Sequence, residues 1–127
     1  MAHPNEDLLR REVEGVSAGG SLADIFTEDI VIHYPGNNPL SGDYHGFPGL
    51  DEFFGKFDEI LTSIERDLHA VIANDEHGVE LLTVRAERKD GRTHEWQAVW
   101  ICHFRDGKIS EFWGTFPDQA ALDEFLG

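Results

Sequence analysis

Two charged side chains on one predicted strand are the first candidates for acid–base chemistry. Arg85 and Glu87 stand two residues apart in an extended segment, so both side chains point to the same side of the strand. In an apolar pocket, burial raises the pKa of a carboxyl group and a nearby guanidinium lowers it, and the balance can tune a general base. The alternative is a solvated ion pair near a turn, which would contribute little.

Two ring side chains at the end of the first apolar strand are the next candidates. His33 and Tyr34 follow a β-branched run and directly precede Pro35. Histidine exchanges protons near neutral pH, and tyrosine can donate a hydrogen bond to an oxygen that becomes negative. One of the two should face a pocket, but a single bulge would exchange them, so the sequence leaves both open. Alternatively, backbone groups at the strand end satisfy either ring.

Other motifs do not have the context that their chemistry needs. Residues 15–19 match G-x-S-x-G but close a predicted helix, whereas a nucleophile elbow follows a strand. The seven histidines form no H-E-x-x-H motif, and no lysine-bearing phosphate loop follows a strand. Cys102 is expected to be a small core residue. We therefore expect neither a metal nor a cofactor.

A predicted mixture of helices and strands must position these residues. A first helix begins near Pro4 and ends at Gly19 and Gly20, and a short second helix covers residues 22–26. Residues 30–32 predict a strand, and the glycine- and proline-rich residues 36–49 predict a shaped loop. Asp118 is expected to cap a short final helix. The second half of the chain predicts an antiparallel meander with turns at NDEHG, KDGR and RDGK. The predicted strands of this meander are Leu68–Ala73, Val79–Arg88, His94–Phe104 and Ile109–Phe116.

The longest amphipathic pattern follows the shaped loop. Apolar residues recur at helical spacing over four turns, at Leu50, Phe53, Phe54, Phe57, Ile60, Leu61 and Ile64. Helices and strands segregate along the chain, which indicates the α+β class and one domain over residues 1–127. A strongly bent sheet wrapped around the long helix would bury its phenylalanines.

Composition excludes several classes of protein. The chain has 127 residues, of which 40% are hydrophobic, and 25 acidic residues face 10 basic ones for a net charge of −15. This acidity disfavours nucleic acid and anionic membrane surfaces as partners. No apolar run approaches the roughly 20 residues of a membrane span. The single cysteine and the absence of a signal peptide pattern lead us to expect a cytoplasmic protein.

Three segments together resemble a known family. DIFTEDIVIHYPG, NPLSGDYHG and FRDGKISEFW, in this element order, resemble the SnoaL-like branch of the nuclear transport factor 2-like superfamily. The resemblance implies a cone, in which a bent sheet and N-terminal helices enclose an apolar pocket, and a homodimer. Its members include polyketide cyclases, ketosteroid isomerases, epoxide hydrolases and dehydratases, and the fold alone does not choose among them.

The family's catalytic positions carry other residues in this chain. Where steroid isomerases have their base, phenolic donor and protonated acid, the matching positions are Tyr34, Glu12 and Trp100. The carboxylate of SnoaL-type cyclases falls on Gly114, which cannot move a proton. Limonene epoxide hydrolases carry Arg-x-Asp on the strand where this chain has Arg85 and Glu87, so the resemblance implies a similar pair here.

The resemblance also implies which faces look into the cone. One face would carry residues 81, 83, 85 and 87, and the ligand contacts would come from Phe53, Thr83, Trp96, Trp100, Phe112 and Phe116. The alternative for these rings is simple core packing. The hypothesis is a pocket for an apolar small molecule, in which a cofactor-free isomerase, cyclase or epoxide hydrolase-like enzyme uses Glu87 as base, Arg85 to position it, and His33 or Tyr34 as acid or oxyanion donor.

A second hypothesis is a non-catalytic ligand-binding or dimeric interaction domain. It is favoured by the replacement of the family's known catalytic carboxylates. On the opposite face of the meander, Val84, Val99, Ile101 and Trp113 would be left exposed to water. Pairing with a second copy would cover them, so we expect a homodimer.

Overall fold

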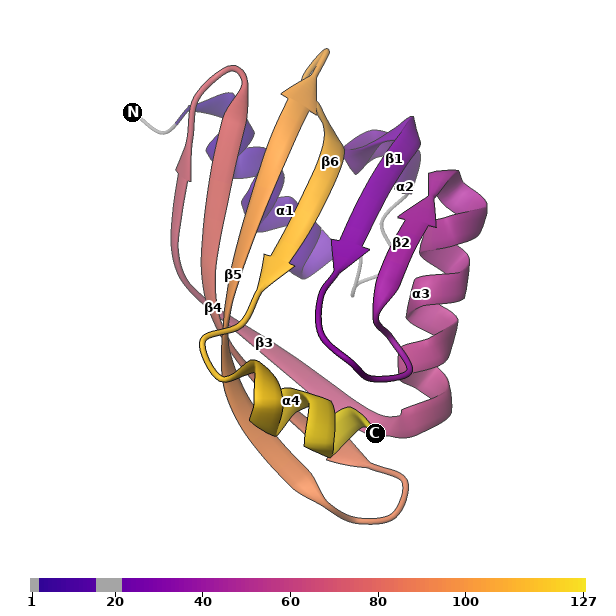
Figure 1. The fold of residues 1–127 in the computed structure, drawn as a ribbon. Coiled ribbons are helices and arrows are strands. Elements are labelled where there is room, and N and C mark those ends of the chain that lie inside the picture. The colour runs from indigo at the N-terminus through magenta and orange to yellow at the C-terminus, as the bar shows by residue number, and fades with distance from the viewer. Residues whose placement is uncertain (1–2, 16–21) are drawn as a thin grey trace.

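The chain folds as one strongly curved sheet with helices packed against it (Figure 1). The structure, a computed structural model, describes residues 3–15 and 22–127. Six strands in this part of the chain form a sheet in the order β2-β1-β6-β5-β4-β3. The elements are α1 (Pro4–Gly15), α2 (Leu22–Ile25), β1 (Phe26–Tyr34), β2 (Gly42–His45), α3 (Gly46–Ile60), β3 (Leu61–Ala73), β4 (His77–Arg88), β5 (Thr93–Arg105), β6 (Lys108–Thr115) and α4 (Gln119–Leu126). The α+β class is therefore confirmed, while the predicted end of the first helix at Gly19 and Gly20 lies outside the described residues.

The predicted antiparallel meander is present from β3 to β6. Each of its three neighbouring pairs is antiparallel, and the sheet continues from β6 to β1 through a parallel pairing. The turn between β5 and β6 holds Asp106 at φ 53° and Gly107 at φ 74°. Two successive positive φ angles define the primed hairpin turn that Asp-Gly favours, so the sequence determines this connection locally.

The structure differs from the sequence prediction in the middle of the chain. The long helix α3 ends at Ile60, and Leu61 and Ile64 belong to β3 instead of to the helix. Their spacing fits a helix by coincidence, because on the strand Leu61 is buried while Ile64 is 44% exposed. The segment predicted as a loop contains β2, which pairs with the end of β1 through four residues, from His45 opposite Val31 to Gly42 opposite Tyr34.

Irregular pairing bends the long strands around the helices. The register of β3 against β4 shifts between Leu61 and Ser63 and again between Leu68 and Ala70, and that of β5 against β6 shifts after His103. An extra residue in one strand increases its local bend and twist. The lower halves of β4 and β5 curve beneath α4 as a result (Figure 1). The concave inner face of the sheet therefore surrounds a space that α1 and α3 border.

The C-terminal helix α4 closes the lower end of this curved sheet. Asp118 begins the helix by accepting a hydrogen bond from the backbone N–H of Ala121 at 3.2 Å, as the sequence predicts. Leu122, Phe125 and Leu126 are buried beneath it. Arg88 of β4 donates hydrogen bonds to the carbonyl oxygens of Phe125 and, at 3.0 Å, of Gly127. The helix is thus attached to the sheet through both apolar and polar contacts.

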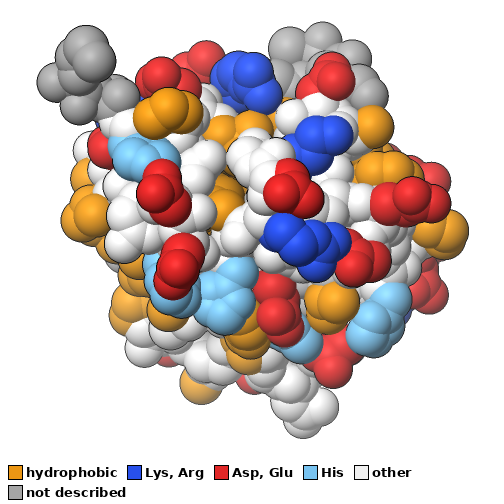
Figure 2. All heavy atoms as spheres, turned by 90° about the horizontal axis from the view of Figure 1, so that it is seen from above, with side chains coloured by type: hydrophobic (Ala, Val, Ile, Leu, Met, Phe, Trp, Pro, Cys, Tyr) orange, Lys and Arg blue, Asp and Glu red, His pale blue; other side chains and the backbone are white. Residues whose placement is uncertain are grey.

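The surface of the molecule mixes charges of both signs. In the view from above, basic side chains lie among acidic ones, and histidines lie at several places from left to right (Figure 2). This face therefore has no continuous basic patch. Among the helices of residues 3–15 and 22–127, none has the length and apolar character to cross a membrane.

Candidate functional site

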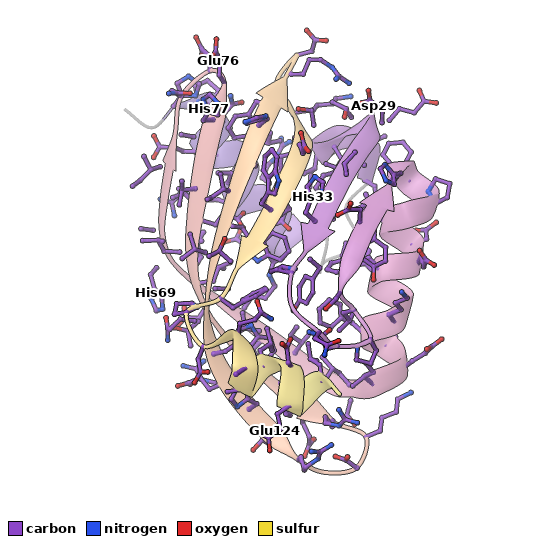
Figure 3. The ribbon with its side chains drawn as sticks, viewed as in Figure 1. Asp29, His33, His69, Glu76, His77 and Glu124 are labelled. Atoms are coloured by element: carbon purple, nitrogen blue, oxygen red, sulfur yellow. The ribbon has the colours of Figure 1, made fainter. Side chains whose placement is uncertain are left out.

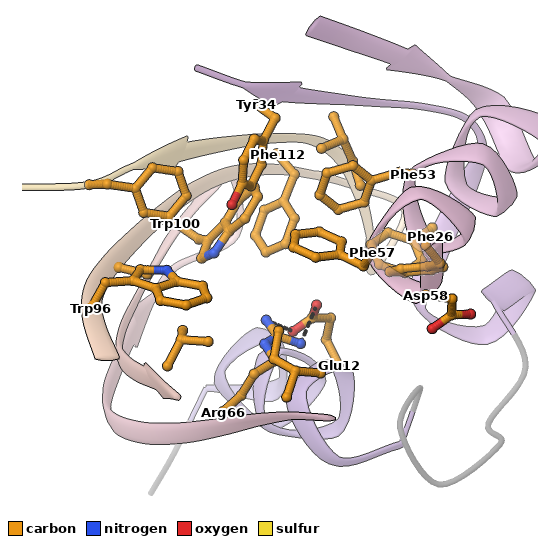
Figure 4. A pocket seen from close by; sticks show the side chains of 16 residues that line it. Glu12, Phe26, Tyr34, Phe53, Phe57, Asp58, Arg66, Trp96, Trp100 and Phe112 are labelled. Carbon is orange, nitrogen blue, oxygen red and sulfur yellow. Dashed lines mark hydrogen bonds and ion pairs between the residues drawn. The ribbon is translucent and has the colours of Figure 1, made fainter. Parts of the chain in front are cut away.

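A cavity of about 360 Å³ lies between the inner face of the sheet and helices α1 and α3 (Figure 4). Its walls are predominantly aromatic because inward positions on β1, β5 and β6, together with one stripe of α3, carry rings. Nine aromatic side chains line it: Phe26, Tyr34, Phe53, Phe54, Phe57, Trp96, Trp100, Phe112 and Phe116. The curved sheet holds these rings around a space that they do not fill.

Ring-to-ring contacts fix the shape of the aromatic wall. The ring of Tyr34 lies 5.1 Å from Phe116, 5.3 Å from Phe53 and 6.0 Å from Trp100, measured between centroids. Trp100 in turn stacks on Phe112 at 4.6 Å. Aromatic pairs at these distances contribute about 0.5–1.5 kcal/mol each beyond the area that they bury. These contacts hold the rings of the wall in fixed positions relative to one another.

Three hydrogen-bond donors in this wall have no hydrogen-bond partner within residues 3–15 and 22–127. The hydroxyl of Tyr34 and the indole N–H groups of Trp96 and Trp100 make no hydrogen bond with any described residue. In Figure 4 the oxygen of Tyr34 and the two indole nitrogens are directed toward the hollow. Burial raises the pKa of the Tyr34 hydroxyl, with smaller contributions from Asp123 and Tyr44, so the group stays a donor. The cavity thus offers donors to oxygen atoms of a ligand.

An ion pair forms the opposite part of the cavity wall. Arg66 of β3 donates two hydrogen bonds to Glu12 of α1, with N–O distances of 3.2 and 3.1 Å. Both residues line the cavity, and Figure 4 shows their pair across from Trp96 and Tyr34. The planar guanidinium and the carboxylate match each other in this bidentate geometry. This arrangement fixes the orientation of a carboxylate within reach of a ligand.

A second carboxyl group lies behind this pair, and a third lies at the edge of the cavity. Glu80 of β4 is completely buried, and its Oε1 is 3.6 Å from Nη2 of Arg66. Asp58 of α3 is exposed and lines the cavity at the end near Phe26 (Figure 4). In the described part of the chain, no group of three or more His, Cys, Asp or Glu side chains is arranged to hold a metal ion.

The structure places most of the predicted ligand-contacting rings in the cavity wall. Phe53, Trp96, Trp100, Phe112 and Phe116 all line it. Thr83 does not, because it lies on the other side of β4. There its hydroxyl donates to Oε1 of Gln97 at 3.2 Å and bonds with the ring of His69. The prediction that Thr83 faces the cavity is therefore wrong.

The predicted inward orientation of Arg85 and Glu87 is also wrong. Arg85 is 49% exposed at its side chain and pairs with Glu95 at 2.7 Å on the outer side of the sheet. Glu87 lies on the same outer side, and together they border a separate surface depression. The even-numbered residues of β4 face inward instead, and Val84 among them lines the cavity. The apolar alternation Leu82, Val84, Ala86 indicated this face, but the charge at Glu80 interrupts it.

The two residues at the end of β1 separate across the sheet. Tyr34 points into the cavity, whereas His33 points to the outer side, between β6 and β2 (Figure 3). Its Nδ1 lies 2.7 Å from Asp43 and its Nε2 lies 2.6 Å from Glu111, and its ring stacks on Trp113. Of the pair that the sequence left open, Tyr34 is therefore the residue at the cavity, and His33 joins three strands.

Sequence reasoning missed the charged part of the cavity. Arg66 lies in the segment where the predicted helix and the predicted strand meet, so its direction could not be assigned. Glu12 matches a family position, but its glutamate type predicts no role there. The signal for it was available, because Glu12 falls between Leu9 and Val13 on the apolar stripe of the first helix. A charge on such a stripe points to a buried partner.

A sequence model of the SnoaL-like domain matches residues 10–112 of this chain. This range covers most of the chain, from the second half of α1 into β6. No match was found among curated proteins.

Solved structures with the same fold cover almost the whole chain. Bal32a from a soil-derived mobile gene cassette is 24% identical, with a TM-score of 0.89 over 98% of this chain and 97% of its own. TerC, co-crystallised with polyporic acid, is 20% identical, with a TM-score of 0.87 over 98% of both chains. IdmH from Streptomyces antibioticus, a proposed polyketide cyclase, is 17% identical, with a TM-score of 0.74 over 94% and 97%. At these identities the likeness shows the fold alone.

The buried ion pair predicts a large loss of stability when its cation is removed. We expect Arg66→Met to lower the free energy of unfolding by about 3 kcal/mol, because the carboxylate of Glu12 would then be buried without a counter-charge. Arg85→Met is the matched control on the outer surface and should change stability by less than about 0.5 kcal/mol. Urea unfolding monitored by circular dichroism compares the two. Equal effects of both substitutions would contradict the assignment of the ion pair.

The contacts of His33 with Asp43 and Glu111 on the outer face form a bridge that should make the free energy of unfolding depend on pH. Partial burial opposes the charged ring, but hydrogen bonds to Glu111 and Asp43 outweigh it and raise the pKa of His33 above 6.5. Its stabilisation is therefore complete below pH 6.5 and is lost as the pH rises through the raised pKa. We expect His33→Asn to cost about 0.5–1 kcal/mol on the acidic side and less on the alkaline side. A difference between the two proteins that is constant over this pH range would refute the bridge.

Proposed function

Because the chain belongs to the SnoaL-like domain family, we propose that its cavity binds an apolar ring compound and transfers protons on it without a cofactor, as an isomerase or cyclase does. The observation that carries this proposal is the composition of the cavity wall. Nine aromatic side chains surround one carboxylate–guanidinium pair and the unpaired hydroxyl of Tyr34. The volume of about 360 Å³ falls within the usual range for small-molecule sites, roughly 300–1,000 Å³.

The residues of the cavity suit a proton shift next to a ring carbonyl. The carboxylate of Glu12 removes a proton from the carbon beside the carbonyl, and the electron pair of that C–H bond moves to the carbonyl oxygen as an enolate forms. Tyr34 donates a hydrogen bond to this oxygen, which carries more negative charge in the transition state. Glu12 then returns the proton to the same or another carbon of the enolate. Arg66 is a positioning residue that holds the Glu12 carboxylate in place.

The relatives support a small-molecule ligand. TerC was crystallised with polyporic acid, and IdmH is a proposed polyketide cyclase. The epoxide hydrolase-like alternative depended on Arg85 and Glu87, and both lie outside the cavity. Proton transfer at carbon therefore has better support than attack of water on an epoxide.

A second proposal is that two copies of this chain associate, as they would in a dimeric ligand-binding domain. On the outer face, Leu81 is 37% and Ile101 is 41% exposed, and Val99 and Trp113 are half-buried beside them. Val84 was expected to join this face but is buried at the cavity. We propose that a second copy of the chain covers these outer apolar side chains in a homodimer.

The catalytic proposal predicts that this protein exchanges protons of a cyclic ketone with solvent. In D₂O, we expect it to replace hydrogen by deuterium at the carbons beside the carbonyl of 2-tetralone, as followed by proton NMR. Glu12→Gln should slow this exchange by about 100-fold or more, because general bases contribute rates of this order. Glu95→Gln, which changes a carboxylate on the outer face, should leave the exchange unchanged.

Ligand binding is measured separately from exchange. Trp96 and Trp100 line the cavity, so a bound ketone should change the intrinsic tryptophan fluorescence. Binding without exchange, or equal exchange by the wild type and Glu12→Gln, would refute the catalytic part and favour the non-catalytic ligand-binding domain. The absence of binding by any cyclic ketone in a panel would refute the proposal as a whole.

The homodimer proposal predicts a change of mass when a charge is placed on the outer face. We expect twice the chain mass of 14.3 kDa for the wild type by light scattering at micromolar concentration, and a monomer for Ile101→Asp. Burying an unpaired carboxylate in an interface is unfavourable, whereas the exposed site in the monomer tolerates it. Glu95→Gln on the same side of the sheet serves as the control and should remain dimeric. A wild type of one chain mass would overturn this proposal.

A further inference from the structure

Glu80 is the one fully buried carboxyl group of the described chain, and the proposed proton shift gives it no direct part. It is 0% exposed and lies on β4 opposite Trp100 of β5. Neither of its oxygens has a hydrogen-bond partner among the described residues. The guanidinium of Arg66 approaches it, with Nη2 lying 3.6 Å from Oε1 of Glu80. A carboxylate with this environment would be buried with its negative charge poorly compensated.

The groups around Glu80 hold one positive charge for two carboxyl groups. Glu12 faces it from α1 and Arg66 from β3, and Cys102 adds a buried thiol from β5. Arg66 donates its two hydrogen bonds to Glu12, so the carboxylate of Glu12 already balances most of its positive charge. Burial first, and then the charges of Glu80 and Glu12, raise the pKa of Cys102, so the thiol adds no charge. An additional anion here would lack a counter-charge, which costs more than the uptake of a proton.

We propose that Glu12 and Glu80 hold one proton between them beside Arg66, and that Glu80 is a positioning residue which keeps this proton while Glu12 reacts at the cavity. Burial and the neighbouring charge of Glu12 raise the pKa of Glu80 well above its usual range, although Arg66 partly opposes them.

This inference rests on the proposed function and explains how the cavity would stabilise an enolate. Before the reaction, the charge of Arg66 is balanced by Glu12. Once Glu12 has taken the proton of the ligand, a neutral Glu80 leaves Arg66 as a free positive charge beside the new enolate. An ionised Glu80 would instead neutralise Arg66 and withhold this stabilisation. The proton on Glu80 therefore makes the charge of Arg66 available when the ligand becomes negative.

The inference is tested on the protein without any ligand. Infrared difference spectra in D₂O at neutral pH should show the C=O stretch of one buried protonated carboxyl group in the wild type. We expect Glu80→Gln to lose this band, because glutamine imitates the protonated side chain without its acid proton. Glu95→Gln, an exposed carboxylate on the outer face, should keep it. A wild-type spectrum without the band overturns the shared proton even if a variant fails to fold.

The pH dependence of stability gives a second readout that simple packing would not produce. A folded pKa above the ordinary 4.5 means that the stability contributed by Glu80 is complete below pH 4.5 and is lost as the pH rises through the raised value. We expect Glu80→Gln to remove this loss and to unfold at a higher urea concentration than the wild type on the alkaline side. Glu80→Gln that is less stable than the wild type at every pH would refute a neutral Glu80.

The outcomes separate this inference from the proposed function. If 2-tetralone binds and exchanges while the infrared band is missing, the cavity chemistry stands and the shared proton is wrong. If the band is present and no cyclic ketone binds, the shared proton stands and the ligand proposal is wrong.

Discussion

Arg66 is the only cation that the described residues contribute to the cavity wall, and it balances the carboxylate that α1 places there. Through Glu12 it holds α1 against β3, and through its proximity to Glu80 it reaches β4. A guanidinium is suited to this position because it remains charged when partly buried and presents several donors in one plane. The same interaction that attaches the first helix to the sheet therefore places a reactive carboxylate in an otherwise apolar space.

The curved sheet supplies the second requirement, which is a space that the rings do not fill. Bulges bend the long strands, and inward rings from β1, β5 and β6 meet those of α3 across a hollow. Gly114 belongs to this arrangement, since a Cβ atom there would lie 3.1 Å from both Phe116 and Trp100. Tyr34 and the two tryptophans then contribute polar edges to an aromatic wall, so that a ligand is oriented as well as enclosed.

Local patterns in the sequence predicted most of the elements. Asp-Gly turns gave the meander, and alternation placed Trp96 and Trp100 on one face of β5. The family resemblance then implied that this face, and that of Phe112 on β6, look into the cone. Local patterns were insufficient where two periodicities overlap, as at Leu61 and Ile64, which fit a helix and a bent strand equally well. They also failed on β4, because Glu80 is a charged residue on the buried side and its neutralisation depends on partners 14 and 68 positions away. Charged residues of the cavity are thus the part of the site that only the tertiary structure reveals.

The parallel pairing of β1 with β6 has a consequence for how the chain acquires its fold. Ile32 lies beside Phe112, so strands about 80 residues apart in the sequence must meet before the sheet is complete. Hairpins of the meander can form early from neighbouring residues, whereas this closing contact carries the entropy cost of a long loop. On the ribosome, the apolar β1 emerges long before β6. Its edge that pairs with β6 therefore stays unpaired until nearly the whole chain has been synthesised. We expect the slow step of folding to be the docking of the N-terminal third onto a preformed meander, and β1 to be the segment that a chaperone would need to shield until then.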